Sequence, residues 1–216
     1  MADQLYLSLW FPNFRFEALP VALISVLRQF TLVSGEKRVS AASVYPIDFT
    51  ESPIYQRIYV NDDRAESTES SIIENAVKEA TEQFHEDMAY EFEMKWNLWM
   101  PESNPAPLAE AALDVLWRPH PSTVKVIGFG PEFDRGAYEQ NGHIRVDFGL
   151  DTPWVMDEET GVDLDEEAKK HIQQNVEMLL AFTLSVEKNS GISGRLLWTE
   201  SGEPLAEKLR TRLSLN

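Results

Sequence analysis

The sequence contains no cysteine, and this absence removes several kinds of chemistry at once. Disulfides, thiolate metal sites, iron–sulfur clusters and cysteine nucleophiles are all excluded. Positive charge is also scarce: 19 lysines and arginines stand against 36 aspartates and glutamates, which gives a formal net charge of -17. Because phosphate contacts require clustered basic side chains, we expect neither a nucleic-acid partner nor binding to an anionic membrane. A basic partner protein, a cation and simple solubility are all consistent with this acidity.

Long hydrophobic runs are missing as well. The first six residues contain no basic region and no apolar core of signal-peptide length. The longest apolar stretch near the start, residues 19–26, is too short to span a bilayer and contains Pro20. We therefore expect a cytoplasmic protein. The hydrophobic fraction of 43% is that of a globular chain with a core.

Motifs for nucleotide binding and nucleophilic catalysis are absent from the sequence. There is no GxxxxGK[ST], no GxGxxG between a strand and a helix, and no GxSxG elbow. The four histidines stand at positions 85, 120, 143 and 171 and show no local metal-binding spacing. These patterns assign no catalytic residue, no metal ligand and no cofactor.

An acidic segment at residues 157–167 raises the alternative of a calcium site. It lacks the register of an EF-hand loop, because Met156 stands where the first aspartate would be needed. Acidic residues before a helix also cap its first turn and oppose its dipole. We therefore expect an exposed loop at residues 157–161 without a specific ion, and a helix cap at Asp163 or Asp165.

The spacing of apolar residues predicts an alternation of strands and helices. Strands are expected at residues 5–11, 39–45, 54–60, 88–99, 123–129, 143–150 and 194–199. Helices are expected at residues 18–30, 72–85, 105–117, 165–187 and 204–213. The first elements follow the order βαββαβ, which resembles the ferredoxin-like superfold, and the second half repeats much of that order. Such a resemblance concerns the fold alone, because this fold hosts many functions.

We therefore predict an α+β protein of two ferredoxin-like (βαββαβ) halves in tandem, residues 1–100 and 101–216, within one compact unit. The long strand at residues 88–99 closes the first half and opens the second, so it should pair with both. The segments 9–12 and 98–101 share the pattern Leu-Trp-x-Pro. This match is consistent with an internal duplication, although unrelated strand ends also share such patterns.

One face of the predicted sheet is the candidate binding surface. Period-two alternation sends apolar residues such as Leu9, Ile54 and Ile58 toward the core, so their neighbours point the other way. The candidate binding residues on that face are Trp10, Tyr55, Arg57, Glu91, Glu93, His143, Arg145 and Asp147. Aromatic side chains beside charged ones are typical of interfaces. Cross-strand pairs that stabilise an exposed sheet are the alternative interpretation.

The function predicted from these features is non-catalytic binding. The protein would use this sheet face or its acidic surface to hold a partner protein, for example a basic toxin or enzyme that it inhibits, or a small-molecule ligand. The alternative is an enzyme that acts on a small molecule. Its general acid and base would come from the same face: His143, Asp147, Glu91 or Glu93.

Overall fold

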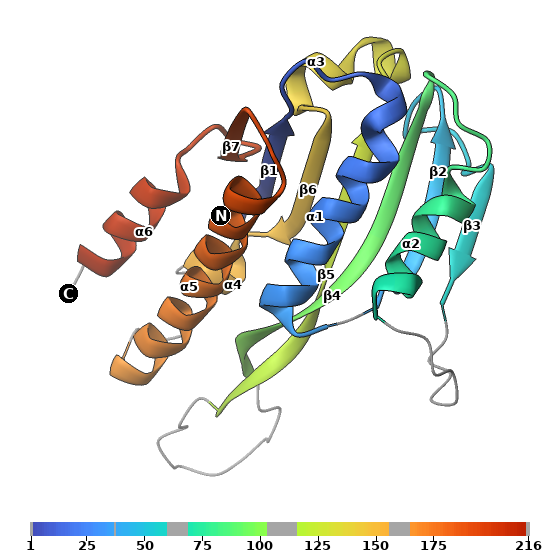
Figure 1. The fold of residues 1–216 in the computed structure, drawn as a ribbon. Coiled ribbons are helices and arrows are strands. Elements are labelled where there is room, and N and C mark those ends of the chain that lie inside the picture. Colours follow the sequence, from blue (N-terminus) through green and yellow to red (C-terminus); the bar gives the residue numbers. More distant parts are fainter. Residues whose placement is uncertain (1, 37, 60–68, 103–115, 156–164, 215–216) are drawn as a thin grey trace.

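The computed structural model describes residues 2–36, 38–59, 69–102, 116–155 and 165–214. Its seven strands form one antiparallel sheet in the order β3-β2-β4-β5-β6-β1-β7 (Figure 1). The strands are β1 (Gln4–Trp10), β2 (Ala41–Pro46), β3 (Tyr55–Ile58), β4 (Met88–Glu102), β5 (Leu116–Phe129), β6 (Ile144–Leu150) and β7 (Gly194–Thr199). Together with the helices they confirm the predicted α+β class.

The helices form a layer on one side of this sheet. The layer consists of α1 (Leu19–Ser34), α2 (Glu69–Ala80), α4 (Thr152–Val155), α5 (Glu166–Asn189) and α6 (Leu205–Ser214), with the short 3-10 turn η1 (Phe16–Ala18). The remaining helix α3 (Ala137–Asn141) and the 3-10 turn η2 (Phe133–Arg135) lie between β5 and β6 in the chain, and Phe133 packs on the other side of the sheet. Figure 1 shows α2, α1 and α5 side by side in front of the sheet, with α6 beyond α5. The opposite side of the sheet has no comparable helical layer among the described residues.

The two tandem ferredoxin-like halves are not confirmed. β1 lies between β6 and β7, so the first strand of the chain pairs only with strands from its C-terminal part. β4 does pair on both sides, with β2 and with β5, as expected for a long shared strand. The helix expected at residues 105–117 is wrong at its end, because Leu116 and Trp117 begin β5. Residues 105–115 lie outside the described residues.

The hydrophobic core fills the space between the sheet and the helices. Every second residue of the central strands points into it, and Leu7, Phe92 and Val126 are fully buried there. Trp96 from β4 packs edge-on against Phe30 of α1, with ring centroids 5.2 Å apart. Fully burying one such side chain stabilises the fold by ~1.5–3 kcal/mol.

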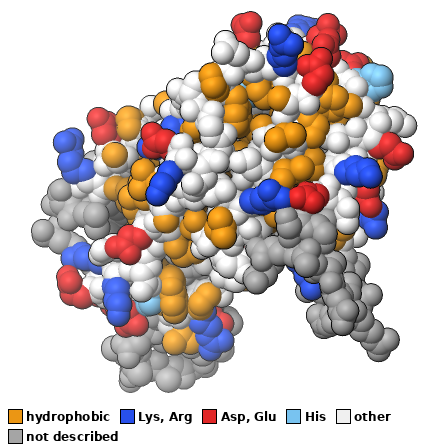
Figure 2. Space-filling view, in the orientation of Figure 1, with side chains coloured by type: hydrophobic (Ala, Val, Ile, Leu, Met, Phe, Trp, Pro, Cys, Tyr) orange, Lys and Arg blue, Asp and Glu red, His pale blue; other side chains and the backbone are white. Residues whose placement is uncertain are grey.

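The segment Phe16–Ser34, which joins η1 to α1, is long and apolar enough to cross a membrane. In the fold it lies at the centre of the helical layer, with Leu23 and Phe30 buried against the sheet. A helix at the centre of a core has the same kind of composition. Its outer side keeps Val21 and Leu32 exposed, and Figure 2 shows hydrophobic side chains gathered over the upper half of this helix.

Polar contacts made by Asp165 and Lys208 fix the later helices. Asp165 begins α5 by accepting a hydrogen bond from the Ala168 N–H at 2.7 Å, which confirms the predicted cap. Asp163 and residues 157–161 lie outside the described residues. Lys208 of α6 donates to Asp3 at 3.1 Å and to Asp151 at 2.8 Å. All three of these side chains are nearly buried, so the ion pairs hold α6 on β1 and α4.

Candidate functional site

The side of the sheet that faces away from the helices carries a mixture of aromatic and charged side chains, and we call it the uncovered face. Strand register brings its members together in rows across β4, β5, β6, β1 and β7. They are Tyr6, Ser8, Trp10, Glu91, Glu93, Lys125, Ile127, Arg145, Asp147, Leu196 and Trp198. One end of the face is covered, because Phe133 of η2 packs there against Phe129, with Phe49 beside it.

Arg145 on β6 is the central cation of the uncovered face. Its guanidinium carbon lies 5.0 Å from the centroid of the Tyr6 ring and 5.3 Å from that of Phe129. The Nε atom is buried and has no hydrogen-bond partner among the described residues. Burial lowers the pKa of Arg145, while the nearby Asp147 and Tyr6 act in the opposite direction. The face therefore holds a partly desolvated cation that forms no ion pair with any described side chain.

Lys125 on β5, by contrast, is already paired. Its Nζ lies 3.1 Å from Glu91 and 4.0 Å from Glu93 on β4. Glu91 is only 4% exposed, and burial raises its pKa despite the attraction of Lys125. Asp147 is engaged as well, because it accepts a hydrogen bond from the Gly149 N–H at 2.8 Å. These contacts stabilise the sheet. Arg145 is therefore the charged group of the uncovered face that keeps a hydrogen-bond donor without a partner among the described residues.

Next to Arg145, the edge strand β7 adds two residues that our sequence analysis did not include in the site. The Trp198 ring lies 4.6 Å from Tyr6, and its Nε1 donates to the Ser8 hydroxyl at 3.0 Å. Leu196, two residues earlier, is 53% exposed. Alternation within residues 194–199 placed both on one side of a strand, but only the pairing of β7 with β1 shows which side that is.

His143 is separated from this cluster, although it precedes β6. Its Nδ1 accepts a hydrogen bond from the Phe11 N–H at 3.0 Å, and its ring stacks on Phe14 with centroids 4.2 Å apart. The centroid of the Tyr138 ring lies 4.7 Å from that of the His143 ring. Burial lowers the pKa of His143 to about 4, so the imidazole is neutral at pH 7. Trp10 is half-buried near this end of the face, opposite Gly194.

Tyr55 and Arg57 do not belong to the uncovered face, which corrects the sequence prediction. Their register partners on β2 are the core residues Val44 and Ala42, so both side chains point toward the helices. Ile58, which we expected in the core, is 72% exposed. The alternation of isoleucines with Tyr55 and Arg57 gave the wrong side of the strand. Tyrosine and arginine can pack their apolar parts against a helix while their polar ends form hydrogen bonds or ion pairs.

Arg57 and Tyr59 find those partners on α2. Arg57 forms an ion pair with Glu79 at 2.6 Å, and the Tyr59 hydroxyl donates to the same carboxylate at 3.2 Å. Burial, together with the nearby Tyr55 and Glu79, raises the pKa of Tyr59 well above its usual value. β3 and α2 are therefore joined by a polar cluster at the edge of the sheet.

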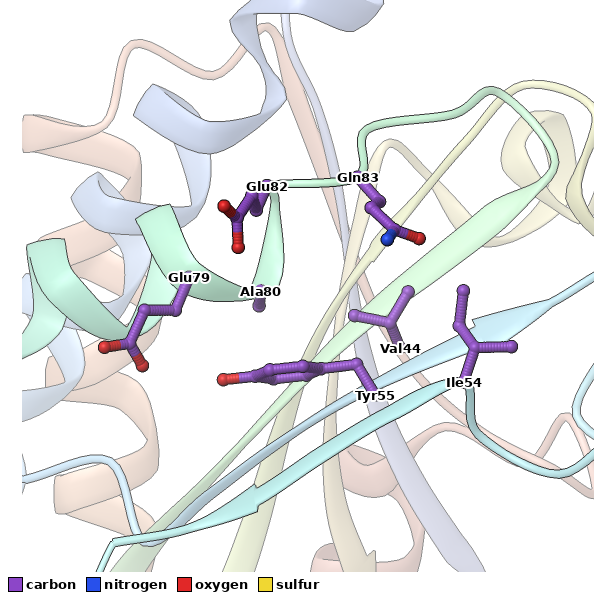
Figure 3. Close-up of a pocket in the computed structure, with 7 residues that line it drawn as sticks. All are labelled: Val44, Ile54, Tyr55, Glu79, Ala80, Glu82 and Gln83. Atoms are coloured by element: carbon purple, nitrogen blue, oxygen red, sulfur yellow. The ribbon is translucent and has the colours of Figure 1, made fainter.

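A pocket of about 100 Å³ opens beside this cluster (Figure 3). It is lined by Val44, Ile54, Tyr55, Glu79, Ala80, Glu82 and Gln83. Figure 3 shows the Tyr55 ring on one side and Ala80, Glu82 and Gln83 on the other, with the Tyr55 hydroxyl directed toward Glu79. That hydroxyl oxygen is buried and has no hydrogen bond of good geometry within the described part of the chain.

A groove follows on the other side of the turn after α2. Its lining is Phe16, Glu17, Phe84, His85, Glu86, Asp87 and Glu132. The Phe16 and Phe84 rings stack at 3.9 Å and form its apolar part. Four of the seven lining residues carry carboxylates, and none is a lysine or an arginine.

Comparison of the chain with protein-family models, with curated proteins and with solved structures gives no match. The function is therefore argued from the geometry of the fold alone.

Proposed function

We propose that the protein is a non-catalytic binding protein that holds a partner protein on the uncovered face, with Arg145 binding a carboxylate of that partner. The observation that supports the proposal is the partly buried guanidinium of Arg145, which has no ion-pair partner among the described residues. Charges withdrawn from water are normally paired. A partner carboxylate would supply the missing charge and could accept two parallel hydrogen bonds from the guanidinium.

The surroundings of Arg145 suit contact with protein rather than with water. Tyr6 and Trp198 form a tilted ring pair beside it, and Leu196 adds an exposed apolar side chain on the same face. Tyrosine, tryptophan and arginine are the residues that most often contribute binding energy at the centre of interfaces. A surface made only for solubility would carry lysine and glutamate in these positions.

The alternative, an enzyme with acid–base groups on the same face, draws less support from the geometry. His143 already accepts a backbone hydrogen bond on Nδ1, and because burial lowers its pKa to about 4 it is not the charged imidazolium that acts as a general acid at neutral pH. Glu91 is bonded to Lys125. Neither group therefore stands free to move a proton to or from a substrate.

Photo-crosslinking with competition tests the proposal. A benzophenone amino acid placed at Leu196 should give a discrete adduct in an extract of the native host, and the same amino acid placed at Leu32, on the helical side, should not. Excess unlabelled wild-type protein should abolish the adduct, whereas Arg145→Ala protein should compete at least tenfold less well. Arg118→Ala is the matched control, because Arg118 is an exposed arginine paired with Glu102 away from this face. If the Arg145→Ala protein, shown to be folded by circular dichroism, competes as well as wild type, the proposal is wrong.

A further inference from the structure

The pocket between β3 and α2 lies on the helical side of the sheet edge, away from Arg145, and it has the chemistry of a cation site. Its polar lining consists of the Glu79 and Glu82 carboxylates, the Gln83 amide and the Tyr55 hydroxyl. No lysine or arginine is among the lining residues. We propose that this pocket binds the side chain of a lysine in a basic segment of a partner protein.

The acceptors of the pocket suit an ammonium group. A lysine ammonium carries three N–H donors that point in different directions, and the pocket is lined by two separate carboxylates, those of Glu79 and Glu82. Glu79 is bonded to Arg57 and Tyr59, but a carboxylate has about four lone-pair sites and accepts further bonds. Glu82 forms no ion pair with the described residues. A planar guanidinium would instead require a carboxylate placed for two parallel bonds.

The apolar lining fits the rest of a lysine side chain. The Tyr55 ring forms one wall, and a cation over its face gains cation–π attraction. Val44 and Ala80, both buried, and Ile54 at the rim provide contacts for the methylene chain. The volume of about 100 Å³ leaves room for an ammonium and its nearest methylenes.

A metal ion fits the described residues less well than an ammonium does. Among them, no three aspartate, glutamate or histidine side chains come close enough to hold an ion together. Mg²⁺ and Ca²⁺ need six or more oxygen ligands, and the aliphatic wall of this pocket supplies none.

The acidic groove beyond the turn indicates that the lysine belongs to a polypeptide. Glu82 and Gln83 line the pocket, and the next residues of the chain, from Phe84 to Asp87, line the groove. Carboxylates of Glu17 and Glu132 continue the negative charge there. A chain with one lysine in the pocket would therefore place neighbouring basic residues over a surface of opposite charge, which a free amine could not do.

Nuclear magnetic resonance titration with short peptides tests this inference. The probe is N-acetyl-tetralysine amide, and the signals are the methyl groups of Val44, Ile54 and Ala80. We expect saturable shifts of these methyl signals with tetralysine, weaker ones with tetra-arginine, and none with tetralysine whose ε-amines are acetylated. Because the readout is local to the pocket, it stays independent of any result obtained with Arg145.

Two variants of equal charge separate the pocket from general attraction to an acidic protein. Glu82→Gln should weaken tetralysine binding about twofold to fivefold, as expected for an ion pair close to the surface. Glu139→Gln, an exposed acid on α3, removes the same charge elsewhere and should leave the affinity unchanged. Equal losses in the two variants would show that only net charge matters and would overturn the inference. Saturation by n-butylammonium at the same affinity as tetralysine would overturn the assignment to a polypeptide.

Discussion

Asn175 on α5 bonds to both backbone groups of Trp99 on β4. Its Oδ1 accepts from the Trp99 N–H at 2.9 Å, and its Nδ2 donates to the Trp99 carbonyl at 2.9 Å. Nδ2 also donates to the Pro153 carbonyl at 2.8 Å. β2 stops pairing with β4 at Glu93, so the amide takes the place of an adjacent strand beyond that point. One fully buried side chain therefore joins α5, α4 and the long arm of β4.

Replacing this amide should cost much of the stability of the fold. In Asn175→Ala the Trp99 backbone and the Pro153 carbonyl lose their partners in a mostly buried place, and we expect the free energy of unfolding to fall by ~2–4 kcal/mol. Urea unfolding followed by circular dichroism measures the change. Gln173→Ala on the exposed side of the same helix is the control and should change stability by less than about 0.5 kcal/mol. Similar losses in the two variants would show that the amide is not the joint described above.

The depressed pKa of His143 predicts a specific sensitivity to acid. The pKa is about 4 in the folded protein and about 6.5 in an unfolded chain. The neutral His143 ring contributes fully to the free energy of unfolding above pH 6.5. This contribution disappears as the pH falls toward 4, because the histidine of the unfolded state takes up its proton first. His143→Gln keeps a hydrogen-bond acceptor but cannot titrate.

The comparison of these two proteins isolates the histidine from the many carboxylates. Between pH 7 and pH 4.5, wild type should lose about 2 kcal/mol more stability than His143→Gln, a value reduced from the full shift because the ring is partly exposed. Urea unfolding at several pH values measures both curves. Parallel curves across this range would mean that His143 titrates normally in the folded protein.

Gly130, at the end of β5, should not tolerate a side chain. A Cβ atom at this position would lie 2.2 Å from the backbone oxygen of Glu86, whose segment cannot withdraw easily because the Glu132 N–H also bonds that oxygen. We expect Gly130→Ala to lower the free energy of unfolding by about 2 kcal/mol or more. Gly194→Ala, where a Cβ would meet no atom within 4 Å, is the matched control and should be neutral or slightly stabilising. Thermal unfolding gives the melting temperatures of the Gly130→Ala and Gly194→Ala proteins. Equal melting temperatures would contradict the expected clash.

Local pattern predicted the elements of this fold better than their arrangement. The strands that became β1, β4 and β6 were located within a few residues, because core-facing apolar residues recur at every second position in each. The strand that became β7 was located as well. The first part of β5 was missed because Pro119 and Pro121 discourage a strand. Among the described strands, that part of β5 pairs with β4 alone, so a proline whose nitrogen faces its other edge removes no ladder hydrogen bond there.

The candidate site was predicted in part for a related reason. Glu91, Arg145 and Asp147 share the uncovered face because they lie on central strands whose apolar partners must point to the core. Tyr55 on the edge strand β3 was assigned to the wrong side of the sheet. Alternate residues of β3 point to opposite sides, and both groups contain side chains able to cover a helix, so the pattern does not show which group faces the core. Trp198 was not assigned, because its neighbour Tyr6 lies at the other end of the chain and no local signal joins them.

The place of β1 between β6 and β7 has a consequence for how the protein is made. The ribosome releases β1 before it has synthesised either of the strands that pair with it. Leu5, Leu7 and Leu9, which are buried in the fold, therefore gain their neighbours on both sides of β1 only after β7 has been synthesised. Such late, long-range pairing slows folding and leaves an apolar strand open to aggregation until its partners are present.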